Sequence, residues 1–260
     1  MENPAPVSVG EIRAHLHTAV FGRQLVAEPL LPSANTAARR LAQDGAPEGT
    51  VVTADAQSAG RGRRGREFFS PAGGVYLSIV LRPGPETDAG LITSCAAVAV
   101  ARAIESLCPQ TVQIKWVNDL LIGGRKVCGI LTESELEPQT GALRFAILGI
   151  GINVAAAVFP PPLDKLATSL GNEGTAPDRN RLIAALLNEW ERAYAAMGSG
   201  AFLAESRRRS AVLGRTVTVE RGNERFCAYA EAIDDAGRLQ VRTPDGKTIV
   251  LPSGEVSIRL

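Results

Sequence analysis

Residues 60–66, with the sequence GRGRRGR, place four arginines and three glycines in one short segment. Each arginine carries a planar fork of N–H donors that suits phosphate and carboxylate oxygens. Glycine permits positive φ angles and lets the backbone approach a bound group closely. On composition alone the segment could be a solvated basic loop or an RG-type nucleic-acid tract. Its position between two expected strands, 50–55 and 75–81, favours an ordered loop that binds anions.

A second group of candidate residues lies where an expected strand ends. Lys115 comes just before the pair Asn118 and Asp119, so an ammonium, an amide and a carboxylate gather at one edge of a sheet. Such a set could bind a nucleotide and its Mg²⁺, because magnesium prefers hard oxygen ligands. An Asn-Asp turn beside a chance lysine is the simpler alternative.

Two glycine-containing segments follow. The Gly-Gly pair at 123–124 predicts a tight hairpin turn, after which Lys126 can reach a ligand oxygen or extend into water. In residues 148–154, alternation places Gly149, Gly151 and Asn153 on one face of a strand. Such a bare face suits a flat ligand, although a packed helix would also explain it. The glycine spacing of residues 148–154 does not match G-x-G-x-x-G, and G-x-x-x-x-G-K-[ST] does not occur in the chain.

The composition limits the class of protein. The chain has 260 residues, 45% of them hydrophobic and 21% charged, as in an ordinary soluble globular protein. The net charge of +1 makes the arginine cluster a local field, which counts against nucleic acid as the main partner. The apolar stretches are too short to span a membrane, and the first residues do not form a signal peptide. We therefore expect a cytoplasmic protein with no membrane partner.

Cysteine and histidine offer little chemistry. The four cysteines form no C-x-x-C pair and are expected to be reduced core residues. The only histidines, His15 and His17, lie near the N-terminus, which argues strongly against a histidine-dependent hydrolase. Catalysis would have to use arginine, lysine, carboxylates and amides.

The elements that must position these residues follow from periodicity and turn signals. An amphipathic segment is expected at 9–21. The expected helices are 34–42, 92–107, 178–197 and 202–211, and the expected strands are 50–55, 75–81, 112–116, 119–122, 126–133 and 143–154. Beyond Gly214 the pattern changes to short strands at 216–220, 225–234, 238–242 and 248–251. We therefore expect two domains, residues 1–211 and a small β-barrel at 212–260.

Taken in order, the motifs closely resemble those of biotin protein ligases, the biotin-[acetyl-CoA-carboxylase] ligases. The likeness extends from about Leu31 to the C-terminus. Its segments are 57–66 (QSAGRGRRGR), 69–71 (FSP), 115–119 (KWVND), 125–131 (RKVCGIL) and 149–154 (GIGINV). The resemblance implies an α/β (α+β) fold, in which a mixed-sheet catalytic domain of the biotin/lipoate ligase type precedes a small SH3-like β-barrel.

The resemblance also implies an activity. Such a ligase activates biotin with ATP as biotinyl-5′-AMP and transfers it to one lysine of a biotin carboxyl carrier protein or domain. Mg²⁺ would be carried mainly by the ATP phosphates, with its protein ligands unknown. Only about thirty residues precede Ser33, so we expect a short form without an N-terminal helix-turn-helix domain and no DNA partner. A homodimer is compatible with this assignment.

The family's functional residues can be carried over by position. Arg61 and Arg63 are assigned to the biotin carboxylate and phosphate region, and Lys126 to the bridging acyl-phosphate oxygens. Arg66 and Lys115 are assigned to the ATP phosphates. Asp119 is assigned to the incoming lysine or a metal. Catalysis is thus expected to depend on Lys126, Arg63, Arg61 and Asp119.

Further residues are expected to contact biotin or ATP. Gln57, Ser33 and the backbone around Gly129 should hold the ureido ring of biotin. Phe68 or Phe69 should border adenine, together with Asn118 and Asn153. The remaining expected contacts are Ala34, Asn35, Gly60, Ile130, Gly149 and Gly151. The loop 60–66 should be mobile when empty and close over the intermediate.

One departure and two alternatives remain. Family members usually have Ser-Thr-Asn where this chain has Ser33-Ala34-Asn35, so one hydroxyl near the ureido group is missing and biotin affinity is expected to change. A lipoate-protein ligase or octanoyl transferase would share the fold, although the loop 60–66 and residues 125–129 favour biotin. A non-enzymatic RNA-binding module is the alternative from another class of protein.

Overall fold

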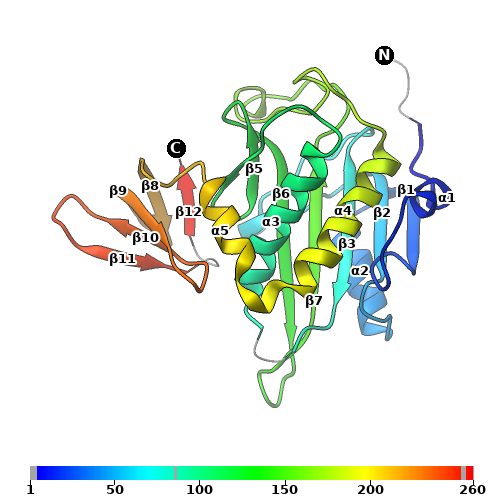
Figure 1. Cartoon of the computed structure of the whole chain (residues 1–260), viewed down its shortest axis with the longest axis horizontal. Helices are drawn as coiled ribbons and strands as arrows, with labels where there is room; N and C mark the ends of the chain where they lie inside the picture. Colours follow the sequence, from blue (N-terminus) through cyan, green and yellow to red (C-terminus); the bar gives the residue numbers. More distant parts are fainter. Residues whose placement is uncertain (1–4, 85–86, 253–255, 260) are drawn as a thin grey trace.

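The computed structural model describes residues 5–84, 87–252 and 256–259. Its larger part is built on a seven-stranded mixed sheet in the order β1-β2-β3-β7-β6-β5-β4 (Figure 1). Only β1 and β2 pair in parallel, and the other neighbours are antiparallel. The strands are β1 (Leu25–Leu31), β2 (Val51–Gln57), β3 (Val75–Leu81), β4 (Gln113–Lys115), β5 (Asp119–Ile122), β6 (Arg125–Leu136) and β7 (Leu143–Ile152).

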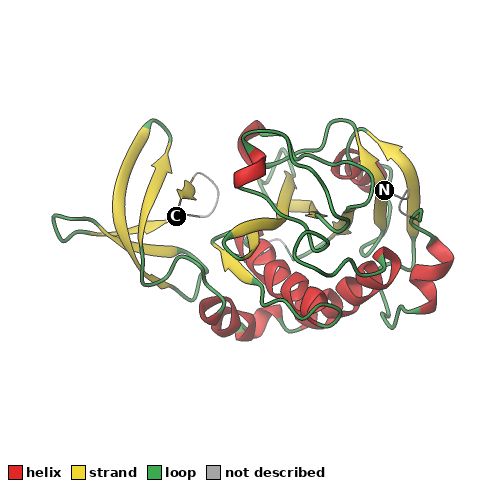
Figure 2. Cartoon of the chain, turned by 90° about the horizontal axis from the view of Figure 1, so that it is seen from above, coloured by secondary structure: helices red, strands yellow, loops and turns green. Residues whose placement is uncertain are grey.

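Helices cover both faces of this sheet. One face packs against α3, α4 and α5 in the main hydrophobic core, and the other packs against α2 in a smaller apolar cluster (Figure 2). The helices are α1 (Val9–Ala14), α2 (Ala34–Gln43), α3 (Ala89–Glu105), α4 (Arg179–Ala195) and α5 (Ala201–Arg208), with short 3₁₀ turns at Arg63–Gly65, Leu163–Lys165 and Met197–Ser199. Because both of its faces are covered, β3 is buried along its whole length.

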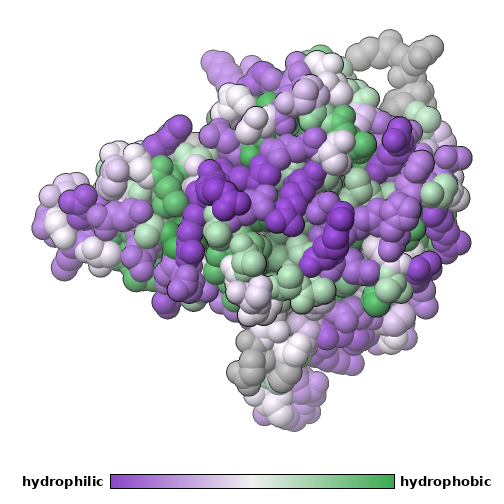
Figure 3. Space-filling view, in the orientation of Figure 1, coloured by the Kyte–Doolittle hydropathy of each residue, from purple (hydrophilic) through white to green (hydrophobic). Residues whose placement is uncertain are grey.

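The C-terminal part is a five-stranded antiparallel sheet in the order β11-β10-β9-β8-β12. Its strands are β8 (Thr216–Arg221), β9 (Glu224–Ile233), β10 (Leu239–Arg242), β11 (Thr248–Leu251) and β12 (Val256–Arg259). This part projects as a separate lobe, and polar side chains are spread over much of the face in view (Figure 3). The predicted mixed-sheet domain followed by a small β-domain is confirmed.

The two parts are joined through a motif of the larger sheet. Trp116 and Val117 follow β4, yet both are buried in the hydrophobic core of the C-terminal lobe. The Trp116 indole Nε1–H donates a 2.9 Å hydrogen bond to the carbonyl oxygen of Gly237. The smaller lobe is therefore anchored directly beside Asn118 and Asp119.

Two sequence expectations need correction. The segment 9–21 is helical only to Ala14, because carboxylate oxygens of Glu191 accept the backbone N–H groups of residues 19–21 and hold them as a loop. Strand β1, which contains Pro29, is absent from the expected strands. The proline is tolerated since β1 is an edge strand, and the pairing register with β2 skips Pro29. Strand β12 was also missed.

Among the helices of the described chain, none combines the length and apolar character needed to cross a bilayer.

Candidate active site

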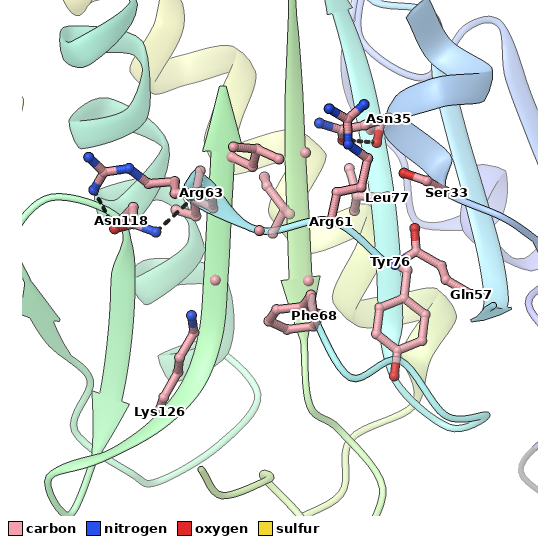
Figure 4. Close-up of a pocket in the computed structure, with 18 residues that line it drawn as sticks. Ser33, Asn35, Gln57, Arg61, Arg63, Phe68, Tyr76, Leu77, Asn118 and Lys126 are labelled. Atoms are coloured by element: carbon pink, nitrogen blue, oxygen red, sulfur yellow. Dashed lines mark hydrogen bonds between the residues drawn. The ribbon is translucent and has the colours of Figure 1, made fainter. Parts of the chain in front are cut away.

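A pocket lies on the α2 side of the large sheet, between the start of α2, the segment 57–68 and strands β3, β6 and β7 (Figure 4). It brings together most of the predicted site residues from five separate stretches of the chain. The lining residues are Ser33, Asn35, Gln57, Arg61, Gly62, Arg63, Phe68, Tyr76, Leu77, Ser78, Asn118, Lys126, Gly129, Ile130, Leu131, Gly149, Ile150 and Gly151. Basic, amide and apolar groups therefore share one cavity.

Paired glycines form the floor of the pocket. Gly129 of β6 lies directly opposite Gly151 of β7, and the Phe68 ring rests on both. A Cβ atom added at Gly151 would lie 2.6 Å from that ring, and one at Gly129 would lie 2.9 Å from it. At Gly149 the added Cβ would lie 1.9 Å from Asn35 Oδ1. The bare face thus accommodates an aromatic ring at one end and the first turn of α2 at the other.

The arginine-rich segment 60–66 is folded as a small hairpin over this floor. The Phe68 N–H donates to the Gly60 carbonyl oxygen at 2.9 Å, and the Gly62 N–H donates to the Arg66 carbonyl oxygen at 2.7 Å. Arg64, at φ 59°, occupies the turn between these bonds. Gly60 is required because a Cβ atom there would lie 2.4 Å from the Phe68 carbonyl oxygen. The glycines therefore bring the arginines close to the sheet.

Three cations from two elements converge on the pocket, and each has an oxygen partner. Arg61 Nη2 lies 2.9 Å from Glu133, Arg63 Nη1 donates to Asn118 Oδ1 at 2.9 Å, and Lys126 Nζ lies 2.6 Å from Asp119. In Figure 4, Arg63 and Lys126 lie on one side of Phe68 and Arg61 lies on the other. The arrangement can bind an extended anion across the floor.

The Arg63 guanidinium lies in a partly desolvated environment. Burial lowers the pKa of its guanidinium from the ordinary value. The Asp119 carboxylate opposes this shift, while the neighbouring Arg64 and Arg66 act in the same direction as burial. Since the cost of burial falls on the charged form, an anion bound beside Arg63 would offset it.

Polar groups for a neutral ligand lie at the α2 end. Gln57 accepts from the Ala34 backbone N–H at 2.8 Å through Oε1 and donates to Ser70 Oγ at 2.9 Å through Nε2. Ser33 is the N-cap residue of α2, but its hydroxyl makes no capping hydrogen bond. The Ser33 hydroxyl is therefore available to a ligand that enters the pocket.

Some predicted contacts do not line the pocket. Ala34 is 2% exposed and packs in the apolar cluster under α2, so only its backbone N–H reaches the site. Gly60 begins the hairpin and packs closely against the Phe68 carbonyl oxygen. Asn153 follows β7 and is buried, with its Nδ2 donating to the Thr168 carbonyl oxygen at 2.9 Å. The periodicity of the helix or strand does not predict where the side chains of Ala34 and Asn153 lie, because packing contacts determine their positions.

The three remaining predicted residues lie at the edge of the site. Arg66 Nη2 is 3.9 Å from Glu220 of β8 and borders a shallow groove against the C-terminal lobe. Lys115 lies at the end of β4, outside the pocket wall. Asp119 does not line the pocket, but it contacts two residues that do, Lys126 at 2.6 Å and Asn118 at 3.2 Å. The ligand contacts assigned to these three residues remain predictions.

Sequence reasoning missed six lining residues. Tyr76, Leu77 and Ser78 lie on β3, which reads as an apolar core strand; the others are Gly62, Leu131 and Ile150. Period-two spacing of Tyr76 and Ser78 was the available signal, because it puts two polar groups on one face. Between Phe68 and Phe69, the structure places only Phe68 in the pocket, while Phe69 packs on Phe159 with ring centroids 6.1 Å apart.

Comparison with known proteins agrees with this geometry. Residues 28–153 match the biotin/lipoate A/B protein ligase family, and residues 212–259 match the biotin protein ligase C-terminal domain. A bifunctional ligase/repressor BirA of Bacillus subtilis is 39% identical over 256 residues, which cover 95% of this chain and 78% of the relative. A biotin–[acetyl-CoA-carboxylase] ligase of Mycobacterium tuberculosis is 36% identical over 219 residues, covering 80% of this chain and 79% of the relative.

A solved structure is similar over nearly the whole chain. It is a biotin protein ligase from Aquifex aeolicus in complex with biotin and ATP, with a TM-score of 0.79 and 26% sequence identity. The match covers 91% of this chain and 99% of that one. The predicted resemblance is thus confirmed by sequence and by fold, and the chain belongs to the biotin protein ligase family.

Proposed function

We propose that this chain is an ATP-dependent biotin ligase that forms biotinyl-5′-AMP and transfers biotin to a lysine of a carrier protein. The observation that carries the proposal is the convergence of Arg61, Arg63 and Lys126 over the paired glycines Gly129 and Gly151. Two anions must be brought together for adenylation, and three cations around a narrow floor suit that task. The family to which the chain belongs supports the same activity.

In the first step, a biotin carboxylate oxygen attacks the α-phosphorus of ATP and pyrophosphate leaves. No protein nucleophile is needed, because the attacking group and the leaving group both belong to the substrates. Arg61 and Arg63, which line the pocket, would neutralise the two anions, and Lys126 would stabilise the bridging oxygens. Gln57 and Ser33 are placed to hold the ureido ring at the other end of the pocket.

In the second step, the amine of the acceptor lysine attacks the acyl carbon of biotinyl-5′-AMP, and AMP leaves as the new amide forms. Asp119 would assist by accepting a hydrogen bond from the incoming amine. The hairpin 60–66 would exclude water from the intermediate, since acyl adenylates are hydrolysed readily. The acceptor class that we propose is the carrier protein or domain of a biotin-dependent carboxylase.

Magnesium would enter as the counter-ion of ATP. Within the described residues, no group of three or more His, Cys, Asp and Glu side chains could hold a metal ion. Asp119, a carboxylate at the pocket edge, is already engaged by Lys126. These residues therefore fit Mg²⁺ carried by the ATP phosphates, where it would neutralise charge on the polyphosphate.

Incubation with ATP, Mg²⁺ and biotin, followed by mass spectrometry, tests the proposal. Biotinyl-5′-AMP should appear, and addition of a carrier domain should consume it. Lipoate in place of biotin is the matched control, because a lipoate ligase would form the lipoyl adenylate instead. Absence of any biotinyl adenylate from folded protein would contradict the proposal. The cytoplasmic location, the homodimer and the absence of a DNA partner stay predictions, and several relatives are named bifunctional ligase/repressors.

A further inference from the structure

Glu133, which does not line the pocket, connects the arginine-rich hairpin to the sheet. It lies on β6 with its side chain 15% exposed. Its Oε1 is 2.9 Å from Arg61 Nη2 and 3.6 Å from Arg39 Nη2, while its Oε2 accepts a 2.8 Å hydrogen bond from Asn35 Nδ2. One carboxylate therefore contacts the hairpin, the first turn of α2 and the second turn of α2.

The carboxylate is itself held in a fixed orientation. Ser78 of β3 donates a 2.6 Å hydrogen bond to Asn35 Oδ1, and both residues are buried. The same Oδ1 occupies the space beside Gly149 that a Cβ atom would otherwise fill. Because Asn35 is fixed on two sides, its Nδ2 determines where the Glu133 carboxylate points. Figure 4 shows the Arg61 guanidinium beside Asn35, as this chain of contacts requires.

The contact between Glu133 and Arg61 is suited to positioning rather than to locking. Arg61 is 49% exposed, so solvent screens the ion pair and makes it easy to break. A guanidinium also carries five N–H donors, more than one carboxylate can use. Arg61 can therefore keep Glu133 as a partner and still bind a substrate anion.

We propose that Glu133 is a positioning residue for the ligation reaction. It holds Arg61, and with it the hairpin 60–66, against the pocket wall before the substrate binds. This inference rests on the proposed function. Arg61 is then oriented in advance, so less conformational freedom is lost when biotin and ATP bind. Without Glu133, the hairpin would cover the adenylate less often.

The test compares Glu133→Gln with Glu135→Gln. Glu135 lies two residues further along β6 and binds Arg39 at 2.8 Å, whereas the ion pair of Arg61 is with Glu133, which makes Glu135 a matched control. Glu133→Gln keeps the shape and the acceptor for Asn35 but removes the charge. We expect KM for biotin to rise roughly two- to fivefold, as for loss of a half-exposed ion pair, with a smaller change in kcat. Glu135→Gln should change neither.

A second measurement separates positioning from a general structural effect. If Glu133 acts through Arg61, the double variant Arg61→Ala, Glu133→Gln should have the same KM as Arg61→Ala alone. Additive effects in the double variant would overturn the inference, as would equal KM values for Glu133→Gln and Glu135→Gln.

Hydrogen exchange of residues 60–66 without ligand gives a readout that does not depend on activity. Exchange should be faster in Glu133→Gln than in Glu135→Gln, and equal rates would contradict the inference. If the unmodified protein forms no biotinyl-5′-AMP, the proposed function fails, whereas the exchange experiment still tests the contact.

Discussion

Lys126 and Asp119 face each other from neighbouring strands, with the lysine Nζ 2.6 Å from a carboxylate oxygen. Lys126 is the second residue of β6, the strand that also carries Gly129, and Asp119 begins β5. The Phe68 ring centroid lies 5.5 Å from the same ammonium group. The lysine is therefore held between a carboxylate and an aromatic ring at the mouth of the pocket.

We expect Lys126→Ala to lower the rate of adenylate formation by about 10²–10³, because the variant loses one donor to charge that develops in the transition state. The unfolding free energy should change by less than about 1 kcal/mol, since the ion pair is partly exposed. Single-turnover kinetics and thermal unfolding check the two effects. Arg125→Ala is the control, because Arg125 is adjacent but pairs with Glu173 outside the pocket wall. A near-normal rate in Lys126→Ala would refute the assigned role.

Arg63→Gly should release biotinyl-5′-AMP prematurely. The substitution removes the hydrogen bond to Asn118 and a cation beside the phosphate, a loss of roughly tenfold or more in retention of the adenylate. Biotin should then appear on lysines of an unrelated bystander protein, which mass spectrometry can count. Arg64→Gly is the control, because Arg64 lies at φ 59°, where glycine is readily accommodated. Equal bystander labelling by both variants would exclude a specific role for Arg63.

Hydrogen exchange with and without ligand can examine the hairpin 60–66 directly. We expect its backbone amides to exchange faster in the free protein than with biotin and ATP bound, since a bound anion further offsets the repulsion among its arginines. Equal protection with and without ligand would contradict closure of the hairpin over the intermediate.

Two tryptophans offer a matched comparison of stability. Trp116 donates to the Gly237 carbonyl oxygen, whereas the buried Nε1 of Trp190 has no hydrogen-bond partner in the described structure. Trp116→Phe should therefore lose about 0.5–1.5 kcal/mol of hydrogen-bond stabilisation that Trp190→Phe does not lose. Chemical denaturation monitored by circular dichroism would measure the difference. If only the Trp190 variant were less stable, the bond to Gly237 would not anchor the C-terminal lobe.

Buried thiols should make the protein less stable at alkaline pH. Burial raises the pKa of Cys95 to about 12 and also raises the pKa of Cys128. In the unfolded chain these thiols ionise near pH 8.5, so the folded state binds more protons above that pH. Stability should then fall as pH rises toward 12, by up to about 1.4 kcal/mol per pH unit for each thiol.

Denaturant titrations between pH 7 and pH 10 would measure this slope. Cys95→Ala should make it shallower. Cys227 is exposed and should react first with a thiol reagent in the native protein. Fast reaction of all four thiols at neutral pH would show that the core is open.

The sequence motifs located the chemistry of the site well, because glycines and arginines in fixed order have few structural uses. The hairpin 60–66, Lys126 and the paired glycines all meet in one pocket. The opposite wall could not be predicted in the same way. Tyr76 and Ser78 lie in a strand dominated by apolar residues, and their role depends on which face β3 turns toward α2.

Local sequence patterns do not predict which distant segments of the chain come into contact in the folded protein. Strand β1 contains Pro29, and only its place at the sheet edge makes that residue acceptable. Arg66 lies near Glu220 of the C-terminal lobe, a contact that depends on how the lobes pack, and its assignment to the ATP phosphates remains a prediction. Likewise, the link from Glu133 to Arg61 joins segments that no periodicity relates.

The Phe68 ring rests on the surface formed by Gly129 and Gly151, so in the free protein one of its own side chains covers that surface. A planar ligand that uses the same surface must exchange places with the ring. Because the ring is tethered nearby, it competes at a high effective concentration that dilution does not reduce. Measured affinity for such a ligand is therefore the difference between two stacking interactions. A variant with a short side chain at residue 68 would lack the competing ring, so its measured affinity would report the stacking of the ligand alone.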